Sequence, residues 1–250
     1  MEDAQCAADL CRHRGSLRRR ESVVRGVAGV RRRYHLVQSC LPALALDLAS
    51  NDVNLASPSA DVRAFAVAAY AEAIARAVEL GAPAVCIGSG RRHALFPGAD
   101  AKLMDDFRRA FADVQAHAAR AGVGLALENH PQGLLARADA IDAFLAAEGY
   151  DDIGIIYDVA NAFAAGEEPA DGVARLATRL SIVHLSDSPR GGWRHDPIGR
   201  GDVDFRSVGA ALEAVGFAGP VVLEIIADDP AQGIADGLAE LARAGWTFPK

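Results

Sequence analysis

The sequence predicts an α/β fold in which parallel β-strands form a sheet covered by helices on its outer face. Two observations indicate this fold. From about residue 61 onward, short and continuously apolar runs, typical of buried parallel strands, alternate with longer segments of helical periodicity. In addition, 51% of the 250 residues are hydrophobic, which is enough to build one large α/β domain or two small domains. No internal repeat and no interdomain linker is visible.

The elements follow one another in a regular order. The first predicted helix covers residues 61–83, where apolar residues recur with helical spacing, Gly81 can form a C-terminal cap and Pro83 prevents continuation. The apolar run at 84–90 is the first clear strand. Later units repeat the pattern, with strands predicted at 123–129, 153–159, 181–187 and 220–226 and helices predicted at about 101–121, 137–147, 169–180, 204–216 and 230–244.

The N-terminal part of the chain departs from this pattern. A sixth strand is predicted at 43–49, but only 42 residues precede it, whereas two βα units of an eight-fold barrel need about 60. Residues 12–33 are dense in Arg and contain no convincing strand. We therefore expect the first units to be compressed, absent or misrepresented, by a misassigned gene start or a shifted reading frame, or else to form a basic tail. The predicted organisation is an atypical segment at 1–42 and one barrel domain at 43–250.

Composition narrows the class of function. The net charge is −7, and residues 1–33 hold nine Arg against four acidic residues, so the remainder carries 17 basic and 29 acidic groups. Such an acidic body disfavours nucleic acid and favours a metal cation with a small neutral or weakly charged substrate. The four cysteines lack CxxC spacing and indicate free thiols. No apolar run is long enough for a membrane span and no secretory signal is visible, so a cytoplasmic protein is expected.

Four polar residues stand at the ends of successive predicted strands. Glu128, Asp158, His184 and Glu224 are separated by 30, 26 and 40 residues, which is close to one βα unit each. The carboxyl ends of parallel strands in a closed barrel converge on one rim. Taken singly, an acidic residue at a strand end is more often a cap or loop residue, and His184 alone would be read as a core histidine. Four at successive strand ends indicate one shared site.

The residue types at this rim predict a divalent metal. Three carboxylates and one imidazole would repel one another, and burying unpaired carboxylates is costly, unless a cation lies among them. A set of three oxygens and one nitrogen suits Mn²⁺, Mg²⁺ or Co²⁺, and Zn²⁺ remains open.

The motifs that carry these residues resemble the xylose isomerase-like TIM barrels. They read "LALENH", "IIYDVANAF", "IVHLSDSPRGGWRHDPIGRGDVDF" and "GPVVLEI", and the resemblance covers about residues 52–245. It implies a (β/α)8 barrel with an atypical or incomplete N-terminal portion. This group includes sugar phosphate isomerases and epimerases, ketose 3-epimerases, inosose dehydratases and endonuclease IV, so the motifs do not identify one substrate.

The resemblance to the epimerase branch assigns roles to the four residues. Glu128, Asp158, His184 and Glu224 would hold one divalent metal, with Mn²⁺ expected first, and Glu128 and Glu224 would also act as acid and base. The implied activity is a sugar, sugar phosphate or inosose isomerase or epimerase that works through an enediolate. If the first units were missing, a homodimer or a partner strand would have to cover the open sheet edge.

Substrate contacts are expected from other residues of the rim. Asn161 stands where ketose epimerases carry a substrate-binding His, and Arg190 and Arg194 are loose candidates for their substrate Arg. His130 is a further candidate. The set of predicted substrate-binding residues comprises Asn161, His93, Arg194, His195, Arg190 and Trp193. "GRGD" at 199–202 is interpreted as a tight turn.

Two other functions stay open. Endonuclease IV cleaves DNA at abasic sites with three zinc ions, and His195 stands where that family has a zinc-binding His. However, Asn161 replaces a further His and Trp193 occupies the place of an Asp, so that ligand set is incomplete. The other alternative is a non-catalytic barrel that only binds a sugar.

Overall fold

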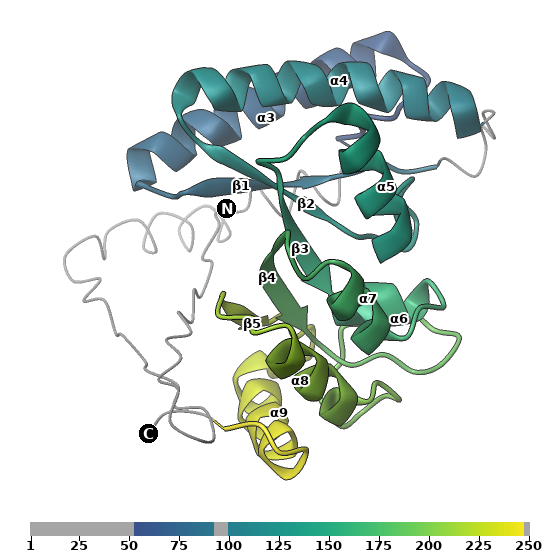
Figure 1. The fold of residues 1–250 in the computed structure, drawn as a ribbon, viewed down its shortest axis with the longest axis vertical. Helices are drawn as coiled ribbons and strands as arrows, with labels where there is room; N and C mark the ends of the chain where they lie inside the picture. Colours follow the sequence, from purple (N-terminus) through teal and green to yellow (C-terminus); the bar gives the residue numbers. More distant parts are fainter. Residues whose placement is uncertain (1–52, 93–99, 248–250) are drawn as a thin grey trace, which may run out of the picture.

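A computed structural model describes residues 53–92 and 100–247 of the chain. Helices and strands alternate along it (Figure 1). The elements are α3 (Ala60–Leu80), β1 (Ala84–Gly88), α4 (Asp100–Ala121), β2 (Gly124–Glu128), α5 (Ala138–Glu148), β3 (Gly154–Asp158), α6 (Val159–Ala164), α7 (Pro169–Arg175), β4 (Leu180–Leu185), α8 (Phe205–Ala214), β5 (Val221–Leu223) and α9 (Pro230–Arg243).

The five described strands form one parallel sheet in sequence order, from β1 to β5. The helices cover the outer face of this curved sheet (Figure 1). Side chains alternate between the two faces of each strand, so Leu127, Tyr157 and Val183 are fully buried under the helices. The residues between them face the other side, where the site lies. The predicted α/β fold with a parallel sheet is confirmed.

Two buried groups join the helices to one another and to this sheet. Phe107 and Phe111 of α4 pack against Phe144 of α5, with ring centroids 5.3 and 5.6 Å apart. The carboxylate of Glu167, which follows α6, accepts hydrogen bonds from the Tyr157 hydroxyl (3.0 Å) and from the first backbone N–H of α5 (3.2 Å). The phenylalanine rings therefore join α4 to α5, and Glu167 joins β3 to α5.

The structure differs from the sequence-based elements at three places. The short helix α6 begins directly after Asp158, whose carboxylate caps it, although this segment carries no helical periodicity of its own. Helix α7 ends at Arg175 rather than near 180. Strand β5 ends at Leu223, so Glu224 follows the strand, although its N–H still bonds to Leu185 O (3.0 Å).

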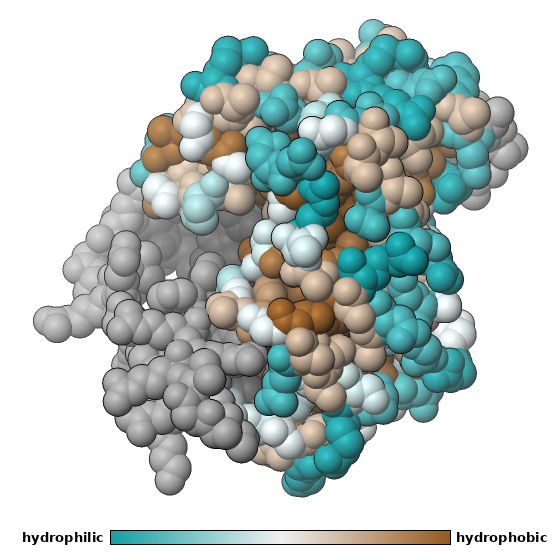
Figure 2. Space-filling model, viewed as in Figure 1, coloured by the Kyte–Doolittle hydropathy of each residue, from teal (hydrophilic) through white to brown (hydrophobic). Residues whose placement is uncertain are grey.

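Several predictions fall outside the described residues. These are the strand at 43–49, the atypical segment 1–42 with its boundary at 43, and the position of His93. On the face shown in Figure 2, hydrophilic residues surround a group of adjacent hydrophobic ones near the centre of the view. Within residues 53–92 and 100–247, no helix has the length and apolar character that crossing a membrane requires.

Asp106 on α4 is expected to contribute strongly to stability. Its buried carboxylate contacts Lys102 (2.5 Å) and Arg109 (2.6 Å) on the same helix and Arg63 of α3 (3.4 Å). Burial raises the pKa of this carboxyl, but these cations outweigh burial and hold it below its usual value of 3.8. Replacing Asp106 with alanine should lower the free energy of unfolding, measured in urea, by about 1–3 kcal/mol at pH 7.

The pH dependence follows from the lowered pKa of Asp106. The stabilisation is present above the unfolded-state pKa of 3.8 and is lost as the pH falls through the folded-state pKa. The matched control is Asp105→Ala, because Asp105 pairs with Arg108 at the surface and should contribute less than about 0.5 kcal/mol. Equal effects of the two substitutions would contradict a special role for Asp106.

Candidate metal centre

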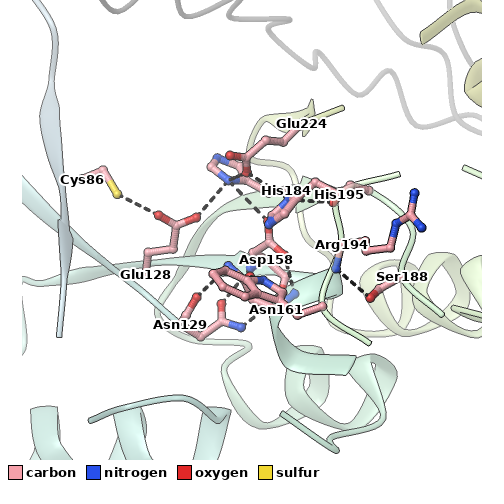
Figure 3. Close-up of polar contacts among 12 residues, drawn as sticks. Cys86, Glu128, Asn129, Asp158, Asn161, His184, Ser188, Arg194, His195 and Glu224 are labelled. Carbon is pink, nitrogen blue, oxygen red and sulfur yellow. Dashed lines mark hydrogen bonds and ion pairs between the residues drawn. The ribbon is translucent and has the colours of Figure 1, made fainter. Parts of the chain in front are cut away.

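The structure brings four side chains from successive strands together at one rim of the sheet (Figure 3). Glu128 ends β2, Asp158 ends β3, His184 lies in β4 and Glu224 follows β5. Each offers one ligand atom, and these atoms all lie within 4.8 Å of one another. Residues separated by about 100 positions meet because every strand runs in the same direction and the sheet curves.

The polar atoms of this cluster lie close to one another, but three of them form no hydrogen bond within the described residues. His184 Nδ1 lies 3.1 Å from Glu128 Oε1, 2.9 Å from Glu224 Oε2 and 3.9 Å from Asp158 Oδ2. Nevertheless, Asp158 Oδ2, His184 Nδ1 and Glu224 Oε2 are buried and have no hydrogen-bond partner among the described residues. Buried polar atoms without a partner are rare in folded proteins and call for an explanation such as an ion.

The electrostatics of the cluster show excess negative charge. Burial raises the pKa of Asp158 well above its usual range, and the neighbouring Glu224 carboxylate raises it further. Burial lowers the pKa of His184, but close contact with Glu128 and Glu224 outweighs burial and raises it. In Glu224 burial opposes ionisation, yet the contact with His184 lowers its pKa to about 2. The cluster therefore favours any positive charge placed at its centre.

These residues fit a divalent cation. Carboxylate oxygens from Glu128, Asp158 and Glu224 and a ring nitrogen from His184 form the mixed donor set that Mn²⁺, Mg²⁺, Co²⁺ or Zn²⁺ accepts. A cation there would partner the buried atoms that lack hydrogen bonds.

Asn129 fixes the rim between β2 and β3. Its side-chain amide donates to Asp158 O (2.9 Å) and accepts from Asp158 N (2.8 Å), so it pairs with the backbone of a cluster residue. It is fully buried. The sequence did not by itself select Asn129 as a site residue. The available signal was an amide directly after the strand-end carboxylate of Glu128. Asn129 acts through Asp158 and is a positioning residue.

Asn161 is buried beneath the rim. Its backbone N–H donates to Asp158 Oδ1 (2.7 Å), and its side-chain amide donates to Asn129 O (3.0 Å). The amide oxygen accepts a hydrogen bond from Trp193 Nε1 (2.7 Å). All three polar groups therefore bond to the protein itself.

Trp193 and two histidines form a group of rings beside the cluster. The Trp193 ring meets the His130 ring edge to face at a centroid distance of 4.7 Å, and the His195 ring at 6.5 Å. Partial burial and the charge of Arg91 lower the pKa of His130 to about 4, so this ring is neutral at pH 7. His195 Nδ1 contacts Ser186 Oγ (3.0 Å) and lies 3.8 Å from Asp158 Oδ2.

The buried side chain of Asp187 holds the loop at 187–203, which carries Trp193 and His195. The buried carboxylate of Asp187 accepts hydrogen bonds from three backbone N–H groups of the loop, those of Ser188 (3.0 Å), Gly199 (2.8 Å) and Val203 (3.1 Å). A Cβ on Gly201 would lie 2.4 Å from Asp187 Oδ1, so only glycine fits there. Gly199 has a φ of +90° and lies in a turn that the hydrogen bond from Arg200 N to Pro197 O (3.1 Å) closes, so the turn predicted at "GRGD" begins two residues earlier, at Pro197.

The two candidate arginines lie apart from the cluster. Arg190 stacks over the Phe163 ring at 4.8 Å and approaches Glu168 (3.5 Å). Arg194 pairs with Asp196 (2.8 Å), and Figure 3 shows its side chain pointing away from the four cluster residues. Both are more than 60% exposed.

Cys86 is a neighbour of the cluster that sequence reasoning missed. Its thiol on β1 donates a hydrogen bond to Glu128 Oε2 (3.1 Å), the oxygen that does not face His184 (Figure 3). A lone cysteine inside an apolar run gives no signal in the sequence, because only the pairing of β1 with β2 brings it beside Glu128.

The relatives that match the chain in sequence include two with the following identity and coverage. An uncharacterised protein of Methanocaldococcus jannaschii is 26% identical over 180 residues, which cover 70% of this chain and 61% of that protein, so the chain spans less than two thirds of its length. The probable endonuclease 4 of Mycobacterium bovis is 31% identical over 199 residues, which cover 76% of this chain and 74% of the relative.

Solved structures share the arrangement of helices and strands. The 3-keto-D-glucoside 4-epimerase from E. coli superimposes with a TM-score of 0.66 at 20% identity and covers 77% of this chain and 76% of its own. At such identity the likeness establishes the fold alone. The family described as xylose isomerase-like TIM barrel matches residues 14–244, a range that begins earlier than the resemblance recognised from motifs. With most of its length matched and its strands in parallel order, the chain belongs to this xylose isomerase-like TIM barrel family.

Proposed function

We propose that the chain is a metal-dependent isomerase or epimerase of sugars, sugar phosphates or inososes. The observation that carries the proposal is the cluster itself, in which buried atoms of Asp158, His184 and Glu224 have no hydrogen-bond partner in the part of the chain that the structure describes. Sugar epimerases are among the solved structures with this fold, which supports the choice of substrate class.

The order of the strands supports two-sided proton transfer. Glu128 comes from β2 and Glu224 from beyond β5, with β3 and β4 between them, so the two carboxylates reach His184 from separate strands of the sheet. A divalent cation, with Mn²⁺ expected first, would supply Lewis-acid stabilisation of an enediolate. One glutamate removes the proton from a carbon beside the carbonyl, and the other returns a proton on the opposite face, which inverts that carbon. Return to the neighbouring carbon gives isomerisation instead.

Abasic-site cleavage is the second candidate, because the probable endonuclease 4 of Mycobacterium bovis is 31% identical to this chain. The structure supplies an argument against it. Asn161 and Trp193 stand where the resemblance to endonuclease IV expects zinc-binding His and Asp, and here these two side chains bond to each other. An amide and an indole occupied in this way offer no ligand to further zinc ions. The net charge of −7 also disfavours DNA.

Elemental analysis followed by an isotope-exchange assay tests the proposal. The purified protein is expected to bind one divalent ion per chain and, in D₂O with a panel of ketoses, inososes and sugar phosphates, to incorporate deuterium at one substrate C–H position. Three zinc ions together with nicking of abasic duplex DNA would select the nuclease. A protein that binds sugar without exchange in the presence of each metal would be the non-catalytic barrel.

A further inference from the structure

Trp193 lies beside the four-residue cluster and is linked to it through His195. Its indole N–H is bonded to Asn161 Oδ1 (2.7 Å), and its ring stands between those of His130 and His195. His195 in turn lies 3.8 Å from Asp158 Oδ2 and 4.0 Å from Glu224 Oε2. A chain of direct contacts therefore connects the indole with two of the four cluster residues.

The orientation of the indole is fixed from two directions. On one side, Asn161 accepts the indole N–H and is itself held by Asn129, which pairs with the backbone of Asp158. From the loop side, Asp187 binds three backbone N–H groups and keeps the 187–203 segment folded. An aromatic ring fixed in this way loses little conformational entropy when a ligand packs on it.

The part of Trp193 that remains open is apolar. The residue is 38% exposed although the only polar group of its side chain is bonded to the protein. A ligand at this position therefore meets a ring face and finds no hydrogen-bond donor on the indole. The chemistry that matches a ring face is a set of C–H groups, which a sugar presents on one side while its hydroxyl groups point elsewhere.

We propose that Trp193 is the specificity-determining platform on which the C–H face of the sugar packs, and that Asn161 is the residue that positions it. The inference rests on the proposed function, because it takes a sugar as the ligand of the neighbouring cluster. It assigns separate roles to the two sides of the site. The four cluster residues act on the reacting carbon atoms of the sugar. Trp193 contacts the rest of the sugar and selects for its shape.

The two tryptophans of the chain make the platform directly measurable. Trp246 donates to Phe205 O (2.8 Å) at the start of α8, away from the ring group. The variant Trp246→Phe leaves Trp193 as the only tryptophan, so its fluorescence reports on the platform alone. Titration with ketohexoses such as D-fructose in the presence of Mg²⁺, which does not quench by paramagnetism, is expected to give a saturable change. The matched variant Trp193→Phe, which retains only Trp246, should give none.

Steady-state kinetics distinguish a substrate-binding role of Trp193 from a merely structural one. Trp193→Ala is expected to raise KM roughly tenfold with a smaller change in kcat, because an aromatic contact is lost in ground and transition states alike. Trp193→Phe keeps a ring face and should recover most of the loss. Asn161→Ala should also raise KM, and this effect should vanish in the Trp193→Ala background, because the amide acts on KM through the indole.

The fluorescence, KM and deuterium-uptake results together distinguish the Trp193 platform from the proposed enzymatic function. Sugar turnover with unchanged Trp193 fluorescence and an unchanged KM in Trp193→Ala would overturn the platform and leave the proposed function standing. A saturable fluorescence change without turnover or deuterium uptake would support the platform and overturn the enzymatic function. The absence of both signals across the panel would overturn both.

Discussion

Asp158→Asn is expected to abolish metal binding and to reduce turnover by about 10³-fold or more. The aspartate is fully buried, and its Oδ2 is one of the atoms that lack a hydrogen-bond partner among the described residues. Asparagine has nearly the same shape, and its side-chain oxygen can still accept from Asn161 N, so the cap of α6 is retained. The substitution thus removes one negative charge from the centre while leaving the local fold. Loss of several kcal/mol of charge stabilisation corresponds to this rate effect.

Thermal unfolding measures the loss of metal binding independently of catalysis. A cation present at 100 times its Kd stabilises the folded state by about 2.7 kcal/mol, which for a chain of this size corresponds to a rise in Tm of roughly 5–10 °C. The wild-type protein should show this rise with Mn²⁺ or Mg²⁺, and Asp158→Asn should not.

A surface aspartate provides the control for this experiment. Asp113 is exposed on α4, so Asp113→Asn should keep both the metal-dependent rise in Tm and the activity. A full metal-dependent rise in Asp158→Asn would show that the cation binds elsewhere, and the proposed centre would then be wrong.

Glu128→Gln and Glu224→Gln are expected to reduce interconversion of the two epimers by about 10²–10⁴-fold, the usual contribution of a general acid or base. The amide oxygen of glutamine can still serve as a neutral ligand in place of the carboxylate oxygen that faces the centre. What each variant loses is the ability to take or give a proton. Measuring the rate of interconversion by chromatography gives this effect.

The two variants should differ in the exchange that they retain. In each variant the remaining glutamate can still remove a proton from one face and return it to the same face. One epimer should therefore continue to exchange its C–H proton with D₂O without inversion, and the other should not. The two variants should retain exchange for opposite epimers, because the proposed mechanism assigns the two carboxylates to opposite faces of the substrate.

An exposed glutamate serves as the control for these variants. Glu213→Gln on α8 should leave both interconversion and exchange unchanged. If Glu128→Gln and Glu224→Gln retained exchange for the same epimer, or if either kept full interconversion, a two-base mechanism would be refuted.

Several features of the molecule were predictable from local sequence. The strands at 84–90 and 123–129 are continuous apolar runs, and the structure places β1 and β2 inside them. The predicted helix at 101–121 matches α4 within one residue, because its apolar residues fall on one face. Helix α6 was missed because it is only six residues long, too short to show a period, and is held by the Asp158 cap and by burial.

The sequence by itself determined the alternation of strands and helices and the four polar residues at consecutive strand ends. Parallel strands bring their carboxyl ends to a common rim, so position in the chain was enough to group Glu128, Asp158, His184 and Glu224. Only the tertiary structure decided that Asn129 binds the Asp158 backbone, that Cys86 faces Glu128 and that Trp193 bonds to Asn161. These hydrogen bonds join residues 29 to 42 positions apart. They depend on distances between rim loops and on strand register, which no local periodicity encodes.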